Sequence, residues 1–180
     1  MILIGAFKKG RNDCMSDFVY ASVSFEMTSI RNLFCRIYQN EHLKIFDYSG
    51  DWGHLMITRG HYGGFDPIET NDHIAAVIGG PVLTFRPNDF LSDISSNEGT
   101  KSILHRWIDG HLHWIDDLDG PYVIVIIEKK KKVIHVVTDI GFYIPVFCHH
   151  DKEMYLSTHI DVVAKAGQCP SCAATLYGRF

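Results

Sequence analysis

The sequence has few cysteines, no clustered basic face and no apolar run that approaches the length of a membrane-spanning helix. Its five cysteines are too few and too scattered for the disulfide framework of a small secreted domain, which favours a reducing compartment. The apolar stretch Met1–Phe7 lacks the basic head and the small-residue cleavage site of a signal peptide. We therefore expect a soluble, cytoplasmic protein without a membrane partner.

The charge of the chain is mild and mixed in sign. Lys and Arg number 17, Asp and Glu number 21, and the net charge is −4 at pH 7. Binding to a phosphate backbone needs several clustered basic residues, and the one such run is Lys129–Lys132. This run separates two apolar segments, so it is typical of a solvated hairpin turn that keeps a sheet edge from associating. Nucleic acid is not an expected partner.

Two neighbouring apolar runs, Tyr122–Ile127 and Val133–Val137, predict a hairpin of strands in a layered sheet. The segment Phe18–Phe25 alternates well enough to be a strand or a loop. Other β-rich runs are bounded by Gly, Asp, Asn or Pro, and they predict strands at Ile2–Phe7, Leu43–Phe46, His54–Arg59, Ile74–Ile78, Ile144–Phe147 and Met154–Ser157.

Apolar residues at three- and four-residue spacing predict helices over Thr28–Tyr38, Thr100–Asp109 and Ile160–Ala166. Thr28 or Ser29 is the expected cap of the first helix, and Gly110 the expected end of the second. A chain of 180 residues suits one domain with a real core. The order of elements predicts an α+β layered sandwich with mostly antiparallel strand pairing.

Several segments match the motifs of one family, namely residues 100–110, 115–127, 138–147 and 155–160. Together they resemble the N-terminal glutamine amidotransferase domain of the asparagine synthetase family, the class II type with the N-terminal-nucleophile (Ntn) hydrolase fold. The resemblance is specific over residues 74–165 and loose over 1–73. It implies a four-layer αββα Ntn-hydrolase-like sandwich over residues 1–166, followed over 167–180 by a tail or the start of a linker.

The resemblance also implies a condition on the nucleophile. In the family it is a cysteine exposed as the first residue after loss of the initiator Met, with its own α-amino group as the base. This chain has Ile2 at that position, and an alkyl side chain cannot attack an amide. The resemblance therefore implies that the chain has no catalytic residue and hydrolyses no glutamine.

Other positions of the implied substrate pocket differ as well. The family's Asn-Gly pair, which stabilises the oxyanion, aligns with Gly79 and Gly80, so only the backbone donor of Gly80 is kept. The aspartate that holds the substrate amine falls at Gly99, with Glu98 beside it. Arg59 stands where the family binds the substrate carboxylate. The implied substrate-binding remnants are thus Arg59, Gly80 and Glu98.

These departures resemble those of β-lactam synthetases and lasso-peptide cyclases, in which such a domain has lost glutamine hydrolysis. The resemblance implies a structural domain, without a cofactor, that partners an asparagine-synthetase-like ATP-dependent ligase domain in cis or in trans in a biosynthetic pathway. A homodimer is a further option. The ligase's Ser-Gly-Gly-Leu-Asp-Ser loop is absent from the 180 residues.

Two other functions stay open. Processing before Cys14 would expose a different nucleophile and give an active amidohydrolase, and Arg59 would suit a module that binds a carboxylate or a peptide. Cys169 and Cys172 have the spacing of half a zinc site or of a redox pair, but no second close pair completes four ligands. The eleven histidines are not spaced to complete a ligand set either, so we expect no bound metal.

Overall fold

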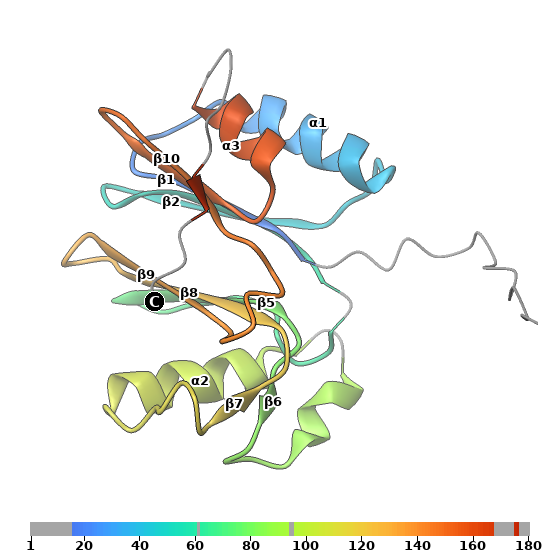
Figure 1. Cartoon of the computed structure of the whole chain (residues 1–180), viewed down its shortest axis with the longest axis vertical. Coiled ribbons are helices and arrows are strands. Elements are labelled where there is room, and N and C mark those ends of the chain that lie inside the picture. The colour runs from blue at the N-terminus through green and yellow to red at the C-terminus, as the bar shows by residue number, and fades with distance from the viewer. Residues whose placement is uncertain (1–15, 61, 94–95, 168–174, 177–180) are drawn as a thin grey trace, which may run out of the picture.

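The computed structural model of the chain describes residues 16–60, 62–93, 96–167 and 175–176. These residues form a mixed α+β fold with two main antiparallel sheets and three α-helices (Figure 1). The predicted α+β class and the predominantly antiparallel pairing are confirmed. The predicted strand Ile2–Phe7 lies outside the described residues.

The larger sheet, which we call sheet A, has β1 in its interior. β1 (Phe18–Ala21) pairs antiparallel with β11 on one side and β3 on the other, so the segment that suited a strand or a loop contains a short strand. The strand order of sheet A is β12-β10-β11-β1-β3-β2. The bounds of the other five strands are β2 Ile45–Gly50, β3 Gly53–Thr58, β10 Phe147–His150, β11 Met154–Ser157 and β12 Thr175–Leu176.

The smaller sheet, sheet B, contains the predicted hairpin. It has the order β4-β5-β8-β9, and the hairpin strands are β8 (Tyr122–Glu128) and β9 (Val133–Thr138). Residues 122–127 of β8 are all buried, as expected of a strand covered on both faces. The remaining strands are β4 Ile68–Glu69 and β5 His73–Gly79 in sheet B, and β6 Val82–Leu83 paired with β7 Leu118–Asp119.

Helices cover the outer face of each sheet (Figure 1). α1 (Met27–Tyr38) and α3 (Ile160–Ala166) pack on sheet A, while α2 (Glu98–Ile108) packs on sheet B. A 3₁₀ helix, η1, spans Asn88–Ser92. All three predicted helices are thus confirmed to within two residues. No helix among the described residues combines the length and the apolarity of a membrane span.

Two local predictions are wrong, and the predicted strand Leu43–Phe46 is displaced, since β2 begins at Ile45 and ends at Gly50. Thr28 and Ser29 do not cap α1, because the helix already begins at Met27 and Glu26 is its N-cap residue. Residues 144–146 are not a strand, because β10 begins only at Phe147. Pro145 has no N–H to donate to a ladder, which is consistent with this irregular approach. Ile144 and Val146 nevertheless belong to the core.

The core has three apolar parts, one between the sheets and one beneath each set of helices. Between the sheets, side chains from β1 and β3 meet side chains from β5 and β8, such as Phe18 and Leu55 against Ile74 and Val125. At the ends of these strands the sheets come into polar contact through Ser16 and Gly79. Arg59 follows the end of β3 and Gly80 follows the end of β5.

Candidate functional site

The head of β1 is held by a polar network around Asp17. The Asp17 carboxylate accepts hydrogen bonds from Thr158 Oγ1 at 2.5 Å and from the Tyr38 hydroxyl. Its backbone N–H donates to Thr58 Oγ1 at 2.7 Å. These bonds join the start of β1 to α1, to the end of β3 and to the residue after β11. They fix the position of the preceding residue, Ser16.

Ser16 connects the two sheets. Its side chain is buried, and its Oγ accepts the backbone N–H of Gly79, the last residue of β5, at 3.3 Å. A Cβ atom at Gly60, two residues beyond the end of β3, would lie 3.0 Å from the same oxygen. The Ser16 hydroxyl therefore sits between the end of a strand of sheet A and the end of a strand of sheet B.

Gly79 occupies a backbone position that no other residue fits. Its φ is +89°, and a Cβ atom there would lie 2.4 Å from the carbonyl oxygen of Pro121. Real Cβ atoms do not approach a backbone oxygen so closely, and the positive φ adds strain for any L side chain. A side-chain hydrogen-bond donor cannot be accommodated at this position without moving the backbone.

The next residue, Gly80, has its backbone donor already engaged. The Gly80 N–H donates to Pro121 O at 3.3 Å. The ring of Tyr62 lies against the Gly80 Cα, because a Cβ placed there would come within 2.3 Å of the ring. The amide that the resemblance assigns to the oxyanion is thus bonded within the protein.

Arg59 is also paired internally. Its guanidinium donates through Nε to Asp66 Oδ1 at 3.1 Å and through Nη2 to Asp66 Oδ2 at 2.9 Å. This two-point geometry is the one in which arginine binds a carboxylate ligand. The two side chains are 24% and 14% exposed, so the pair is partly shielded from water.

The third remnant, Glu98, points to other partners. It lies in the first turn of α2, and its side chain is 47% exposed. Its Oε2 is 3.8 Å from Arg86 Nη2, and its Oε1 is 3.8 Å from Lys101 Nζ. Its neighbour Gly99 donates its N–H to Gly64 O at 2.8 Å. The start of α2 therefore contacts the segment that supplies Asp66, while the Glu98 carboxylate itself pairs with surface cations.

The candidate thiols for a metal site, a redox pair or a nucleophile are not among the described residues. Among the described residues, no three His, Cys, Asp or Glu side chains gather as metal ligands would. Ile2, Cys14, Cys169 and Cys172 lie outside the described residues. Cys148 is a free thiol in β10 whose pKa is raised by burial, which keeps it protonated and less reactive.

Sequence reasoning missed Ser16 and Asp66. Ser16 lies two residues before β1, and α1 follows β1 in the chain. This order of a strand and then a helix was the available signal that Ser16 lies at the start of an interior strand. Asp66 had the weaker signal of an acid close in sequence to Arg59.

No protein-family model matches the chain, and no curated protein matches it. The functional argument therefore depends on the residues and on their geometry.

Proposed function

We propose that the chain is a degenerate class II amidotransferase-like domain that does not hydrolyse glutamine and that stabilises an ATP-dependent, amide-forming ligase in the cytoplasm. We assign it the four-layer Ntn-hydrolase type of sandwich. The stacking of two antiparallel sheets between outer helices supports this assignment. So does the location of the motif segments: three of them contain most of α2, β8 and β11, and the fourth, 138–147, is the connection from β9 to β10.

The observation that carries the proposal is the geometry of Gly79. The resemblance places the oxyanion-stabilising asparagine at this position, yet the backbone leaves no room even for a Cβ atom. An asparagine at this position would therefore require a different path of the backbone as well as a different side chain. An oxyanion donor removed in this way costs about 10²–10³ in turnover in hydrolases that depend on one.

The occupied state of Arg59 supports the same conclusion. A substrate carboxylate would have to displace Asp66, which already makes the two-point contact that the substrate would make. Because Asp66 is tethered to the same chain, it competes at a high effective concentration. Binding of free glutamine at this arginine is thereby disfavoured.

A glutaminase assay tests this proposal. Purified full-length chain is incubated with glutamine and the release of ammonia is followed, with heat-unfolded protein as the background. We expect no release above that background, both alone and with an asparagine-synthetase-like ligase added. Ammonia release that scales with the concentration of the folded protein contradicts the proposal.

A second candidate function is favoured by Ser16. If the bond between Met15 and Ser16 were cleaved, Ser16 would become an N-terminal residue at the head of an interior strand. Its α-amino group could then accept the hydroxyl proton, as in N-terminal-nucleophile amidohydrolases. The Gly79 N–H donates to Ser16 Oγ at 3.3 Å, which places a backbone donor beside the proposed nucleophile.

Mass spectrometry distinguishes the two candidates. The amidohydrolase requires a mature species whose N-terminus is Ser16, together with amide hydrolysis that Ser16→Ala abolishes and Ser24→Ala leaves intact. An intact mass that retains residues 1–15 in the cellular protein removes this candidate. The same measurement tests processing at Cys14, because the two cleavage products differ by two residues.

A further inference from the structure

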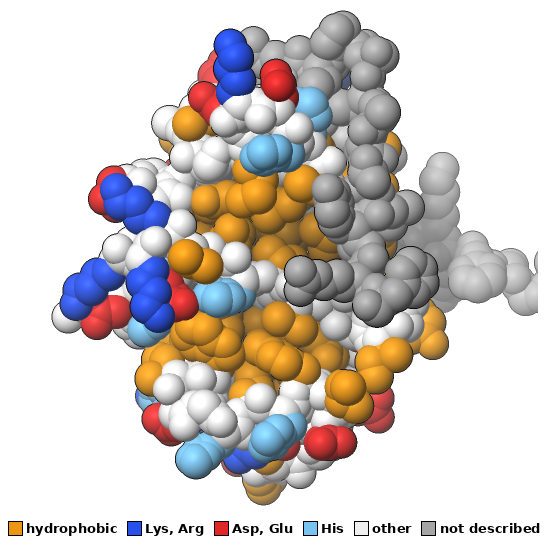
Figure 2. Space-filling view, turned by 60° about the vertical axis from the view of Figure 1, so that its left-hand side comes forward, with side chains coloured by type: hydrophobic (Ala, Val, Ile, Leu, Met, Phe, Trp, Pro, Cys, Tyr) orange, Lys and Arg blue, Asp and Glu red, His pale blue; other side chains and the backbone are white. Residues whose placement is uncertain are grey.

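An apolar groove on one side of the sandwich is lined by β9 of sheet B and by β10 and β11 of sheet A. Its volume is about 720 Å³, and its walls include Val136, Thr138, Cys148, His150, Met154 and Leu156. Figure 2 shows hydrophobic side chains gathered on this side of the molecule, next to charged side chains. The groove is continuous with the core between the sheets, because Val136, Met154 and Leu156 also pack against that core.

One wall of the groove is formed by β9, the edge strand of sheet B. Some of its backbone N–H and C=O groups have no partner strand among the described residues. Asp139 donates its N–H to Tyr122 O at 3.1 Å, so the backbone groups of Asp139 point toward β8. Along an antiparallel strand these groups alternate in direction. The N–H and C=O groups of Ile134, Val136 and Thr138 therefore point to the other side, where no described strand pairs with β9.

This edge lacks the usual protection against pairing. Sheet edges are commonly guarded by lysine, proline or a bulge on the edge strand itself. β9 reads Val-Ile-His-Val-Val-Thr and pairs with β8 in continuous register. The lysines lie in the preceding turn, and each of them forms an ion pair with an acidic residue (Lys129 with Glu69, Lys130 with Asp72, Lys131 with Glu128 and Lys132 with Asp51).

The two sheets also end at different places on this side. Ile134 and Val136 of β9 share the inter-sheet core with Met154 and Leu156 of β11, so β9 and β11 face each other. Sheet A continues past β11 with β10 and β12, whereas no strand of the described ranges continues sheet B past β9. Within the described residues, β10 consequently has no strand of sheet B opposite to it.

We propose that this groove binds one extended segment of another polypeptide, which adds to β9 as a further strand of sheet B. Main-chain hydrogen bonds would form with Ile134, Val136 and Thr138, and alternate apolar side chains of the segment would point at Cys148 and Met154. The extension of sheet A past β9 argues against a second copy of the chain as the occupant. Pairing β9 with β9 of another copy would bring the two projecting edges of sheet A into collision.

A peptide selection on the full-length folded chain tests this proposal. A phage library of random dodecapeptides is panned against the immobilised protein, and enriched sequences are made as fluorescent peptides. We expect enrichment of segments with apolar residues at every second position. Val136→Lys, which places a charge in the groove, should weaken binding at least about tenfold. Val133→Lys on the same strand, whose side chain alternates to the opposite face, should bind as the parent does.

Hydrogen exchange of the unmodified protein provides a readout that does not depend on how the variants fold. Bound peptide should slow amide exchange at Ile134, Val136 and Thr138. The proposal is wrong if no sequence is enriched, if the enriched peptides lack the alternation, or if exchange at these amides is unchanged. It is also wrong if the chain elutes as a dimer that Val136→Lys dissociates, because the occupant is then a second copy.

Discussion

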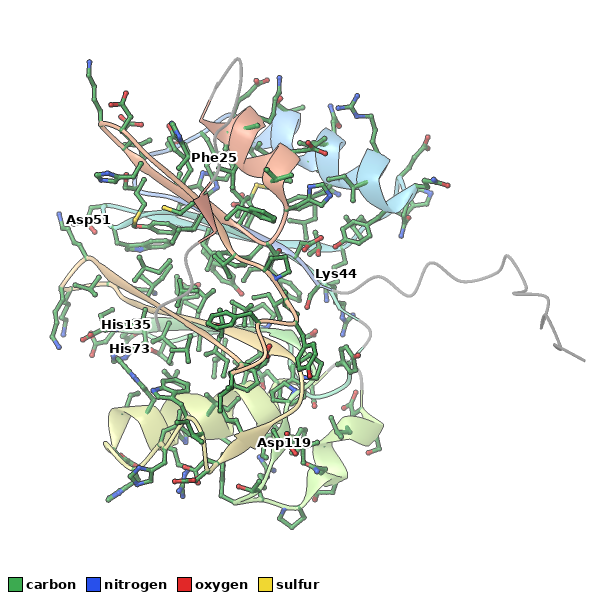
Figure 3. All side chains as sticks on the ribbon, viewed as in Figure 1. Phe25, Lys44, Asp51, His73, Asp119 and His135 are labelled. Carbon is green, nitrogen blue, oxygen red and sulfur yellow. The ribbon has the colours of Figure 1, made fainter. Side chains whose placement is uncertain are left out.

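Lys132 and Asp51 join the tips of two hairpins that belong to different sheets. Lys132 Nζ, in the β8–β9 turn, lies 2.9 Å from Asp51 Oδ2, in the β2–β3 turn, at the end of the sandwich where Asp51 is labelled (Figure 3). Both side chains are well exposed, at 56% and 72%. Water and salt therefore screen the pair, and its contribution to stability should be small.

A double-mutant cycle with Lys132→Met and Asp51→Asn should give a coupling energy of about 0.2–1 kcal/mol from urea unfolding. In about 1 M salt the coupling should nearly vanish, because the Debye length falls to about 3 Å. The Lys130–Asp72 pair, at 2.8 Å and within sheet B alone, is the matched control. A coupling of several kcal/mol that persists in high salt would show that this contact does more than bridge two exposed turns.

Asp66→Asn should convert Arg59 into a site for added carboxylate. The substitution removes the internal charge that now pairs with the guanidinium at 2.9 Å, and it should cost about 1–3 kcal/mol of stability. Added glutamate should raise the melting temperature of the variant above the value of the same variant without glutamate, since a ligand selective for the folded state stabilises it. The parent protein should not respond.

Two controls separate this effect from general ion binding. Asp72→Asn removes an exposed carboxylate paired with Lys130 and should produce no response to glutamate. Arg59→Gln combined with Asp66→Asn should abolish the gain. If glutamate stabilises the parent and the Asp66 variant equally, Asp66 does not occupy the carboxylate position.

Gly79→Ala should destabilise the protein more than Gly110→Ala does. Both glycines have positive φ, +89° and +71°, so both substitutions incur a backbone cost of about 1–3 kcal/mol. Only Gly79 adds a Cβ contact of 2.4 Å with Pro121 O, whereas Gly110 has nothing within 4 Å. Gly79→Asn should not create glutaminase activity. If urea unfolding gives the same loss of unfolding free energy for both substitutions, the backbone at Pro121 moves away from the added Cβ at little cost.

Much of the fold could be predicted because its elements carry periodic patterns. The β8–β9 hairpin is predicted by two apolar runs on either side of a lysine turn, and the first run is buried through residues 122–127. The three helices are predicted by apolar residues at three- and four-residue spacing. The two-residue strands β4, β6 and β7 were not found, because two residues are too few to show a period. Their pairing depends on the strands next to them.

The candidate site was less predictable for a different physical reason. Ser16 contacts Gly79 across 63 residues of chain, so nothing near Ser16 in the sequence reports the contact. The steric limit at Gly79 comes from the carbonyl of Pro121, another distant residue. Arg59 was identified from the resemblance, but its occupation by Asp66 depends on the path of the glycine-rich loop between them.

Acid should remove part of the stability through Glu128. Its carboxylate accepts hydrogen bonds from Lys131 at 2.6 Å and from His135 at 2.8 Å, on the α2 side of sheet B where His135 is labelled (Figure 3). These two hydrogen bonds lower the Glu128 pKa below its ordinary value, and the bond from Lys131 has the larger effect. A lowered folded-state pKa stabilises the protein above the unfolded-state pKa of about 4.3, and this stabilisation is lost as the pH falls through the folded-state value.

Glu128→Gln should therefore be less stable than the parent near neutral pH, and the difference should shrink as the pH falls below about 4. Lys131→Met should shift the pKa of Glu128, followed by carboxyl carbon NMR, back toward its ordinary value, because it removes the Lys131 hydrogen bond that lowers this pKa most. Lys130→Met changes the same turn without touching Glu128 and should leave that titration in place. A stability difference that stays constant from neutral to acid pH would show that Glu128 acts through packing, since only the charged form can make the pH-dependent contribution.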